Sequence, residues 1–125
     1  MITGTVNSNR EAILRLMIRD ANAQDHERDA VVDTGFDGWL SLQPDFISAL
    51  GLRWYRYGIG VLADGSETTF DIYRGDVLWD DRPRFIPIYE MDAEPLVGMS
   101  LMYGYKLVLP ILDGAKFILR RIEIP

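Results

Sequence analysis

Apolar and polar residues alternate with a period of two over most of this chain, which is typical of β-strands that bury one face. The clearest case lies between residues 53 and 91. Two alternating runs there flank the tetrapeptide Ala63-Asp64-Gly65-Ser66: Ile59 and Val61 before it, and Thr68, Phe70 and Ile72 after it. Because Asp-Gly favours the tight turns that join antiparallel strands, this pattern predicts a β-hairpin around Asp64 and Gly65.

Other turn sequences divide the chain into further strands. Thr3–Val6 followed by Asn7-Ser8-Asn9 is typical of the first arm and turn of a hairpin, and Asp80-Asp81-Arg82-Pro83 of a solvated turn. That second turn leads into a strand predicted from Phe85 to Tyr89. Between these elements, Arg74-Gly75-Asp76 predicts a bulge or bend.

The end of the chain predicts one more hairpin. Its arms are Tyr105–Leu112 and Lys116–Ile124, and Asp113-Gly114 supplies the turn. The second arm is rich in β-forming residues and would be an exposed sheet edge in a monomer. We therefore expect it to need a partner.

Two short helices interrupt the strands. The first runs over one or two turns from Pro44 to Gly51, with proline near the start and glycine at the end, as helix termini prefer. After Gly98, the sequence Met99–Tyr103 predicts a single helical turn.

Residues 10–19 fit two patterns. Glu11 and Arg15 stand four residues apart, as in a helix whose apolar side would hold Ile13, Leu16 and Met17. The same residues alternate as a strand would, with Leu14, Leu16 and Ile18 on one face. Propensity favours the helix slightly, so the pattern alone leaves both open.

Residues 21–29 are polar, and we expect a loop there. They hold His26, the only histidine of the chain. A metal site would need several ligands within reach, so we interpret His26 as a surface residue.

Composition narrows the class of protein. A chain of 125 residues with 48% hydrophobic and 26% charged residues is expected to form a single soluble domain over residues 1–125. No apolar run approaches the roughly 20 residues of a membrane span, and the N-terminus has no export signal, so a cytoplasmic location and no membrane partner are expected.

Charge and cysteine content exclude other functions. A net charge of −6 argues against a nucleic-acid partner, which would need a basic face. The absence of cysteine removes disulfides, thiol catalysis and cysteine-bound metals. No cofactor and no metal are predicted, because no histidine cluster exists and the acidic residues are spread along the strands.

The candidate chemistry lies in residues 30–42. There, an apolar run ends in Asp33-Thr34-Gly35, and a second apolar run follows. A carboxylate at the rim of an apolar layer is costly unless hydrogen bonds or a function retain it. Gly35 would allow a tight turn and a close approach by another backbone. Asp-Thr-Gly is also ordinary turn chemistry, in which the side chains cap local N–H groups.

A second stretch strengthens the functional interpretation. Leu96-Val97-Gly98 again runs two apolar residues into a glycine, and together with Asp33-Thr34-Gly35 it resembles the retropepsin-like aspartic proteases. In that family the two segments cross as a ψ-shaped unit. The small prokaryotic members are similar also in Val32–Phe36, in Leu40-Ser41-Leu42 and in a short helix that ends as Leu50-Gly51-Leu52. The resemblance covers roughly residues 4–112 and favours a strand for residues 10–19.

The resemblance implies a fold and an assembly. The fold would be an all-β, partly closed barrel of the acid-protease type with one or two short helices and one Asp-Thr-Gly lobe per chain. Hydrolysis by carboxylates needs two of them around one water, and this chain supplies one such motif. A homodimer would place Asp33 opposite its own copy. Thr34 would lock the two loops across the axis, Gly35 would admit the substrate backbone, and the hairpin around Asp64-Gly65 would be the flap.

Departures from the viral members concern the substrate site. Phe36 stands where those members have a small residue. The viral members also have an aspartate at the position of Asp37, and it pairs with an arginine that directly follows the downstream glycine. This chain has Met99 at the position of that arginine. The hairpin tip, Asp64 and Gly65, is more acidic than the viral tip.

The residues expected to line side-chain pockets are apolar: Leu40, Val61 and Leu96. They predict cleavage beside apolar residues. Trp39 is large enough for a pocket wall, but we favour a place in the core.

The leading hypothesis is therefore an aspartic endopeptidase that is a homodimer and acts on peptides through Asp33, Thr34 and Gly35. The alternative is a non-catalytic dimeric module that binds a peptide or protein on the same fold. A third interpretation is a β-protein in which Asp-Thr-Gly only caps a turn. A serine hydrolase is disfavoured, because the one histidine lies in a loop and no nucleophile elbow exists.

Overall fold

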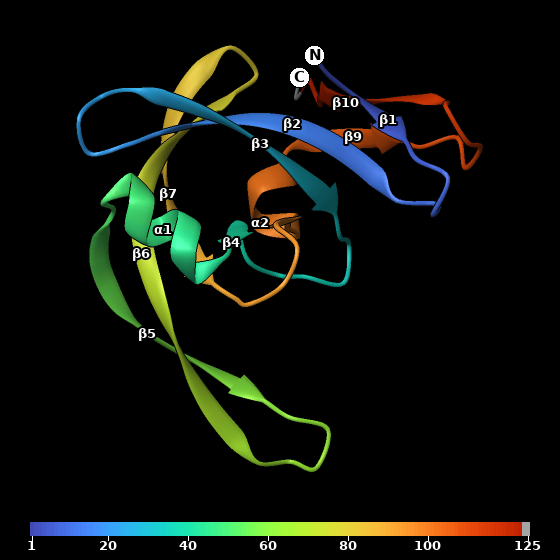
Figure 1. Cartoon of the computed structure of the whole chain (residues 1–125). Helices are drawn as coiled ribbons and strands as arrows, with labels where there is room; N and C mark the ends of the chain where they lie inside the picture. The colour runs from blue at the N-terminus through green and yellow to red at the C-terminus, as the bar shows by residue number, and fades with distance from the viewer. Residues whose placement is uncertain (124–125) are drawn as a thin grey trace.

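The computed structural model describes residues 1–123 and folds them mostly into β-strands, with two short helices (Figure 1). The strands are β1 (Ile2–Val6), β2 (Ala12–Arg19), β3 (Asp25–Val32), β4 (Leu40–Leu42), β5 (Arg53–Val61), β6 (Glu67–Trp79), β7 (Arg82–Glu90), β8 (Leu96–Val97), β9 (Tyr105–Val108) and β10 (Lys116–Arg121). The helices are α1 (Pro44–Leu50) and α2 (Met99–Met102). The all-β class and both short helices predicted from the sequence are confirmed.

All ten strands belong to one sheet, in the order β5-β6-β7-β4-β8-β3-β2-β1-β10-β9. A further pairing joins β2 to β6, with Met17 opposite Leu78 and Ile18 opposite Val77. This pairing closes a ring of strands in the order β6, β7, β4, β8, β3 and β2. The strand β2 buries alternate side chains, as the period of two requires: Ala12, Leu14, Leu16 and Ile18. The strand interpretation of residues 10–19 is therefore confirmed. These side chains join one core cluster with residues of β4, α1, β6, β7 and β10.

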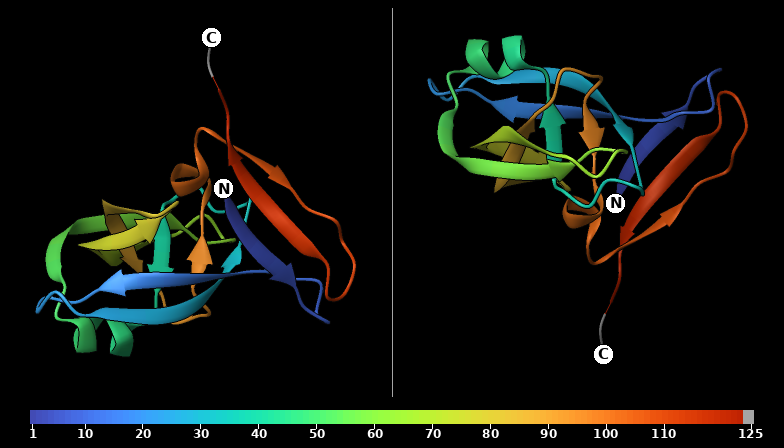
Figure 2. Two further views of the ribbon diagram at one scale, coloured as in Figure 1. Left: turned by 90° about the horizontal axis from the view of Figure 1, so that it is seen from above. Right: turned by 90° about the horizontal axis from the view of Figure 1, so that it is seen from below.

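Three strands, β1, β10 and β9, lie side by side at an angle to the rest of the sheet (Figure 2). The strand β10 pairs with β1 from Ile2↔Leu119 to Thr5↔Lys116, and with β9 on its other side. The prediction that the last arm is an exposed edge was wrong, because β1 satisfies its second row of backbone groups. The exposed edge belongs to β9.

The arms of this last hairpin are also shorter than predicted. The first strand ends at Val108, just before Pro110, which has no N–H for a sheet. The second ends at Arg121, and Ile124 lies outside the residues that the structure describes.

The loop predicted for residues 21–29 was wrong for its second half, because β3 begins at Asp25. Charges hold this polar strand against β2. Arg19 lies opposite Asp25 and Arg15 opposite Asp29, and in each pair the arginine Nε lies 3.2 Å from a carboxylate oxygen. Such cross-strand charge pairs stabilise the pairing of two strands even where one strand, like the first half of β3, has no alternating apolar residues.

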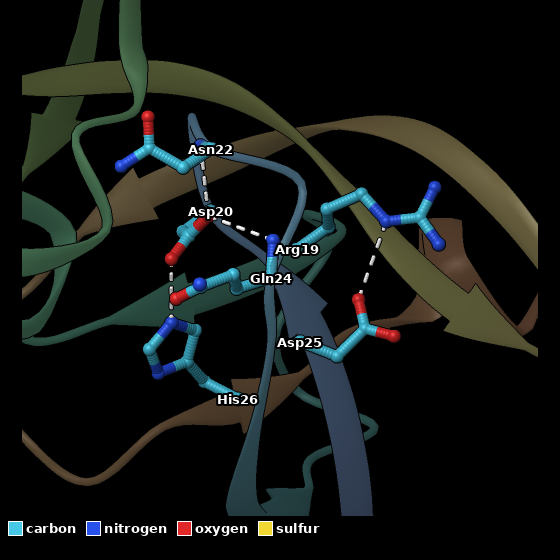
Figure 3. A network of polar contacts seen from close by, with 6 residues as sticks. All are labelled: Arg19, Asp20, Asn22, Gln24, Asp25 and His26. Atoms are coloured by element: carbon cyan, nitrogen blue, oxygen red, sulfur yellow. Dashed lines mark hydrogen bonds and ion pairs between the residues drawn. The ribbon is translucent and has the colours of Figure 1, made fainter.

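The turn between β2 and β3 is organised by Asp20 (Figure 3). Its carboxylate accepts the backbone N–H groups of Asn22 at 2.8 Å and Gln24 at 2.9 Å, and lies 2.8 Å from Nε2 of His26. His26 is half-buried on β3, with its ring edge toward Phe46 of α1. His26 therefore lies in a strand and packs against α1, whereas we predicted a surface position in a loop.

We predicted a bulge or bend at Arg74-Gly75-Asp76, and no bulge lies there. The strand β6 keeps an unbroken register with β7 from Ile72 to Trp79. A register shift lies instead on β5, between Trp54 and Arg56. Gly75 serves close packing, because a Cβ there would lie 3.0 Å from the side chain of Leu52.

The predicted turn at Asp80-Asp81 joins β6 to β7. Both residues adopt positive φ angles of 52° and 65°, as in the tight turns of hairpins. Asp80 is less solvated than expected. Its carboxylate accepts a hydrogen bond from the Tyr105 hydroxyl at 2.9 Å and lies 2.7 Å from the N-terminal ammonium of Met1.

The helix α1 begins at a proline and ends at Gly51, whose φ of 67° is the left-handed conformation that glycine accepts readily. Ile47 and Leu50 are its buried residues. The helix lies against β2 and β3 (Figure 2). Its last residue, Leu50, accepts the backbone N–H of Ala21 in the turn between these two strands.

The predicted hairpin of β5 and β6 extends away from the rest of the chain (Figure 1). At its tip, Gly65 has a φ of 85°, and Asp64 accepts the backbone N–H of Ser66 at 2.8 Å. Nearer its base, the ring of Phe70 covers Gly58, where a Cβ would lie 2.4 Å from it.

Candidate active site

The strand β3 leads directly into the Asp-Thr-Gly loop. It pairs in parallel with β8, Val31 with Leu96 and Val32 with Val97, and the backbone N–H of Asp33 continues this pairing to the Val97 carbonyl at 2.9 Å. On its other side β8 pairs with β4, the strand that leaves the loop. Two segments more than sixty residues apart therefore interlock, as the resemblance implied.

Residues 98–100 hold residues 36–39 of the loop in place through hydrogen bonds to their backbone carbonyls. The N–H of Gly98 donates to Trp39 at 2.9 Å, and that of Met99 donates to Phe36 at 2.8 Å. Ser100 donates twice, from its N–H to the Gly38 carbonyl and from its hydroxyl to that of Asp37. The loop is thus fixed at both of its ends.

Two glycines permit this close approach. A Cβ on Gly98 would lie 2.1 Å from the carbonyl oxygen of Gly38, and one on Gly38 would lie 2.5 Å from the ring of Phe36. At Gly98 the nearest contact is backbone, so a Cβ there would require the chain to move, whereas at Gly38 the aromatic rings of Phe36 and Tyr89 would have to move. The Leu-Val-Gly signal in the sequence thus marks a packing requirement.

The carboxylate of Asp33 is half-buried, and its Oδ1 accepts the backbone N–H of Gly35 at 2.9 Å. Thr34 and Gly35 are exposed. In residues 1–123, no basic nitrogen lies within 4.0 Å of this carboxylate, since none of the ion pairs found there includes it. The loop therefore presents an acidic group without a basic partner directly after the apolar end of β3, residues 30–32.

Phe36 connects this loop to the hairpin. Its ring meets the edge of the Tyr89 ring at a centroid distance of 5.4 Å, and Tyr89 lies 5.2 Å from Phe70 of β6. The three aromatic rings therefore form a continuous contact from the Asp33 loop to the base of the β5–β6 hairpin.

The structure distributes the other candidate residues over several places. Asp37 is exposed in the loop, whereas Val61, Asp64 and Gly65 are exposed at the far end of the hairpin. Leu96 is half-buried on β8. Leu40 is 0% exposed and belongs to the core cluster, so the structure does not place it with a surface that a substrate can touch.

Two serines that position the loop were missed from the sequence. Ser41, buried on β4, accepts the backbone N–H of Leu96 with its hydroxyl at 3.0 Å, and Ser100 anchors Asp37 as described above. The signal for Ser41 was available, because it is a polar residue between Leu40 and Leu42 in an apolar strand.

An apolar hollow of about 680 Å³ adjoins the loop on the side of Thr34. Its wall includes Trp39, Met99 and Tyr103. The last two are 47% and 86% exposed, which is high for apolar side chains of this size. Trp39 is half-buried, packs against the core and also lines this hollow, so both interpretations of it hold.

Across residues 1–123 we find no group of three or more histidine and acidic side chains arranged to hold a metal ion. In the same residues, neither helix has the length and apolar character required to span a membrane.

The geometry can be compared with known proteins. No protein-family model matches the sequence, and no curated protein matches it. Among solved structures, a retropepsin-like aspartic protease from Rickettsia conorii is similar with a TM-score of 0.59. The match is 18% identical in sequence and covers 94% of this chain and 87% of that chain. At that identity the likeness concerns the fold, so this chain has the fold of a retropepsin-like aspartic protease.

Proposed function

We propose that this protein is an aspartic endopeptidase, in which two copies of the chain bring their Asp33 side chains together. One observation carries the proposal. On a retropepsin-like fold, each chain holds one half-buried carboxylate, oriented by the Gly35 N–H and without a basic partner within 4.0 Å in residues 1–123. A carboxylate in such a place is retained by hydrogen bonds, of which the Gly35 N–H supplies one, or by a function.

The chemistry follows from pairing two such groups. Two carboxylates in close contact cannot both ionise, so the pair retains one proton. The ionised Asp33 takes a proton from a water, which attacks the peptide carbonyl, while the protonated Asp33 donates to the carbonyl oxygen. The leaving amine then receives a proton from the pair, and the C–N bond breaks.

The dimer interface we propose is the face around Thr34. The strand β10 already has neighbours on both sides, so it is not a free edge for a second chain. Met99 and Tyr103 instead expose apolar surface beside the loop, in the wall of the hollow next to Thr34. Covering that surface with a second copy would bury it and bring the two loops together.

The substrate would lie between the loop and the β5–β6 hairpin, which would close over it as a flap. Phe36 and Leu96 near the loop and Val61 on the hairpin supply apolar contacts, and we expect cleavage beside apolar residues. Asp64 and Gly65 would form the flap tip, and Asp37 would contact the substrate backbone.

The test is peptide cleavage by the purified protein, measured by mass spectrometry on a library of peptides with apolar residues. We expect Asp33→Asn to lower the rate by about 10²–10⁴-fold, as for loss of an acid–base group, and the exposed Asp45→Asn to leave it unchanged. Equal rates for Asp33→Asn and the wild type would refute the proposal. Peptides bound intact by both proteins would instead favour a non-catalytic binding module.

A further inference from the structure

A second hollow, of about 440 Å³, lies where the β6–β7 turn meets the segment around β9 and the end of β10. Its wall includes three arginines, Arg82, Arg84 and Arg121, together with Trp79 and Tyr105. The chain has a net charge of −6 and only 13 basic residues, so three of them around one hollow are a local concentration of positive charge.

These arginines have no carboxylate partner. In residues 1–123, none of the three guanidinium groups takes part in an ion pair within 4.0 Å. Arg84 makes a long hydrogen bond of 3.4 Å to the Leu101 carbonyl, and its guanidinium lies 5.2 Å from the ring centroid of Trp39. Most of their N–H donors are therefore available to a ligand.

One acidic residue, Asp80, lies close to this positive charge. Asp80 is close to Arg121, but its two oxygens are engaged by the N-terminal ammonium of Met1 at 2.7 Å and by the Tyr105 hydroxyl at 2.9 Å. Asp80 still interacts with Arg121 and offsets part of its charge, so the uncompensated charge belongs chiefly to Arg82 and Arg84.

The side chain of Trp79 also lines this hollow. Trp79 is 2% exposed, and in residues 1–123 its indole Nε1–H has no hydrogen-bond partner. Buried N–H groups are normally paired, because an unpaired one has lost its hydrogen bond to water. This nitrogen is fully buried, so a ligand in the hollow would meet the Trp79 ring, which serves as a reporter beside the arginines.

We propose that this hollow is a binding site for an oxyanion, namely a phosphate or carboxylate group of a small ligand. Guanidinium groups match both, since their planar N–H pairs reach two oxygens at once. The three arginines take no part in the chemistry proposed at Asp33, although Tyr103 lines both this hollow and the one beside Thr34. The proposed site therefore stands whether or not the protein hydrolyses peptides.

The indole N–H groups give a direct test. The chain has three tryptophans, so a ¹⁵N-correlated NMR spectrum shows three indole signals, of which Trp79→Phe and Trp54→Phe identify one each. Sodium phosphate and sodium acetate are titrated separately, at constant ionic strength set with sodium chloride. We expect the Trp79 signal to shift to saturation with one of them, and the Trp54 signal on the distant hairpin to stay in place.

Arginine variants define the site. Arg121→Gln and Arg82→Gln should each weaken binding about tenfold. Arg120→Gln is the matched control, because Arg120 is the exposed neighbour of Arg121 on β10 and does not line the hollow. Each variant is first checked for an unchanged backbone spectrum.

The outcomes separate the ligand classes. Saturable binding of phosphate alone, or of acetate alone, assigns the site to that group. The absence of a saturable shift with either anion would overturn the proposal. Equal affinities for Arg121→Gln, Arg82→Gln and Arg120→Gln would also overturn it. If Trp79→Phe does not fold, identification of the Trp39 and Trp54 signals still assigns the third.

Discussion

At the scale of single residues, the conformation of the Asp33 loop depends on the lack of a Cβ at Gly98. Gly98 passes so close to Gly38 that a Cβ would lie 2.1 Å from its carbonyl oxygen, and three successive N–H groups from residue 98 onward bond to the loop at that point. The position of Asp33 is therefore set by the size of residue 98 as much as by the aspartate itself.

We predict that Gly98→Ala destabilises the protein by about 2 kcal/mol or more, because backbone would have to move to admit the methyl group. The measurement is urea unfolding followed by tryptophan fluorescence. Gly60→Ala on β5 is the control, since its Cβ would have its nearest contact at 3.6 Å. Equal losses for the two variants would show that the clash at Gly98 is relieved elsewhere.

At the scale of elements, apolar alternation fitted the strands that bury a face, although for residues 10–19 it also fitted a helix and only the family resemblance favoured the strand. The segment Ala12–Arg19 became β2 with every second residue buried, and the residues before Gly98 became β8 against Val31 and Val32. The helix α1 also followed from its terminal residues, proline and Gly51.

The same reasoning missed β3, because its first half has no apolar face. Cross-strand charges, such as Arg19 with Asp25, hold it to β2, and they depend on a register that sequence spacing does not reveal. The candidate site divides in the same way. Asp33, Thr34 and Gly35 lie in one loop, but Leu40 is buried because β4 lies inside the sheet, between β7 and β8.

The β2–β3 turn supports a prediction about pH. The pKa of Asp20 lies below its ordinary value, chiefly because of the contact with His26 and then the hydrogen bond from the Gln24 N–H. A lowered pKa stabilises the fold above the ordinary pKa, and this contribution is lost as pH falls through the lowered value.

Asp20→Asn keeps an acceptor oxygen but removes the charge. We expect it to lower the urea midpoint at about pH 6 and to have a smaller effect at lower pH, as the pH falls through the lowered pKa and the wild-type carboxyl also becomes protonated. Asp92→Asn, at an exposed position, should differ little from the wild type at either pH. A deficit for Asp20→Asn that is the same at both pH values would show that the charge is not the stabilising feature.

At the scale of the whole molecule, the pairing of β10 changes how two chains can meet. Its sequence predicted an exposed sheet edge that would need a partner, but β10 pairs with β1 on one side and with β9 on the other (Figure 2). In the dimer that we propose, the second copy contacts a surface other than β10, and the apolar face around Thr34 has Asp33 beside it. Assembly and catalysis would depend on the same few side chains.

The last prediction separates those two roles. Tyr103→Asp places a charge on the proposed interface, and because burying an unpaired charge is costly, we expect dimer dissociation to increase at least about tenfold. Sedimentation equilibrium measures this, and peptidase activity per chain should fall with it and recover at higher protein concentration. Ile111→Asp, in the exposed β9–β10 connection, should leave both unchanged. Asp33→Asn should abolish activity without raising the dissociation constant in this way. A Tyr103→Asp protein that still dimerises like the wild type would place the interface elsewhere, and with it the route by which two copies of Asp33 could meet.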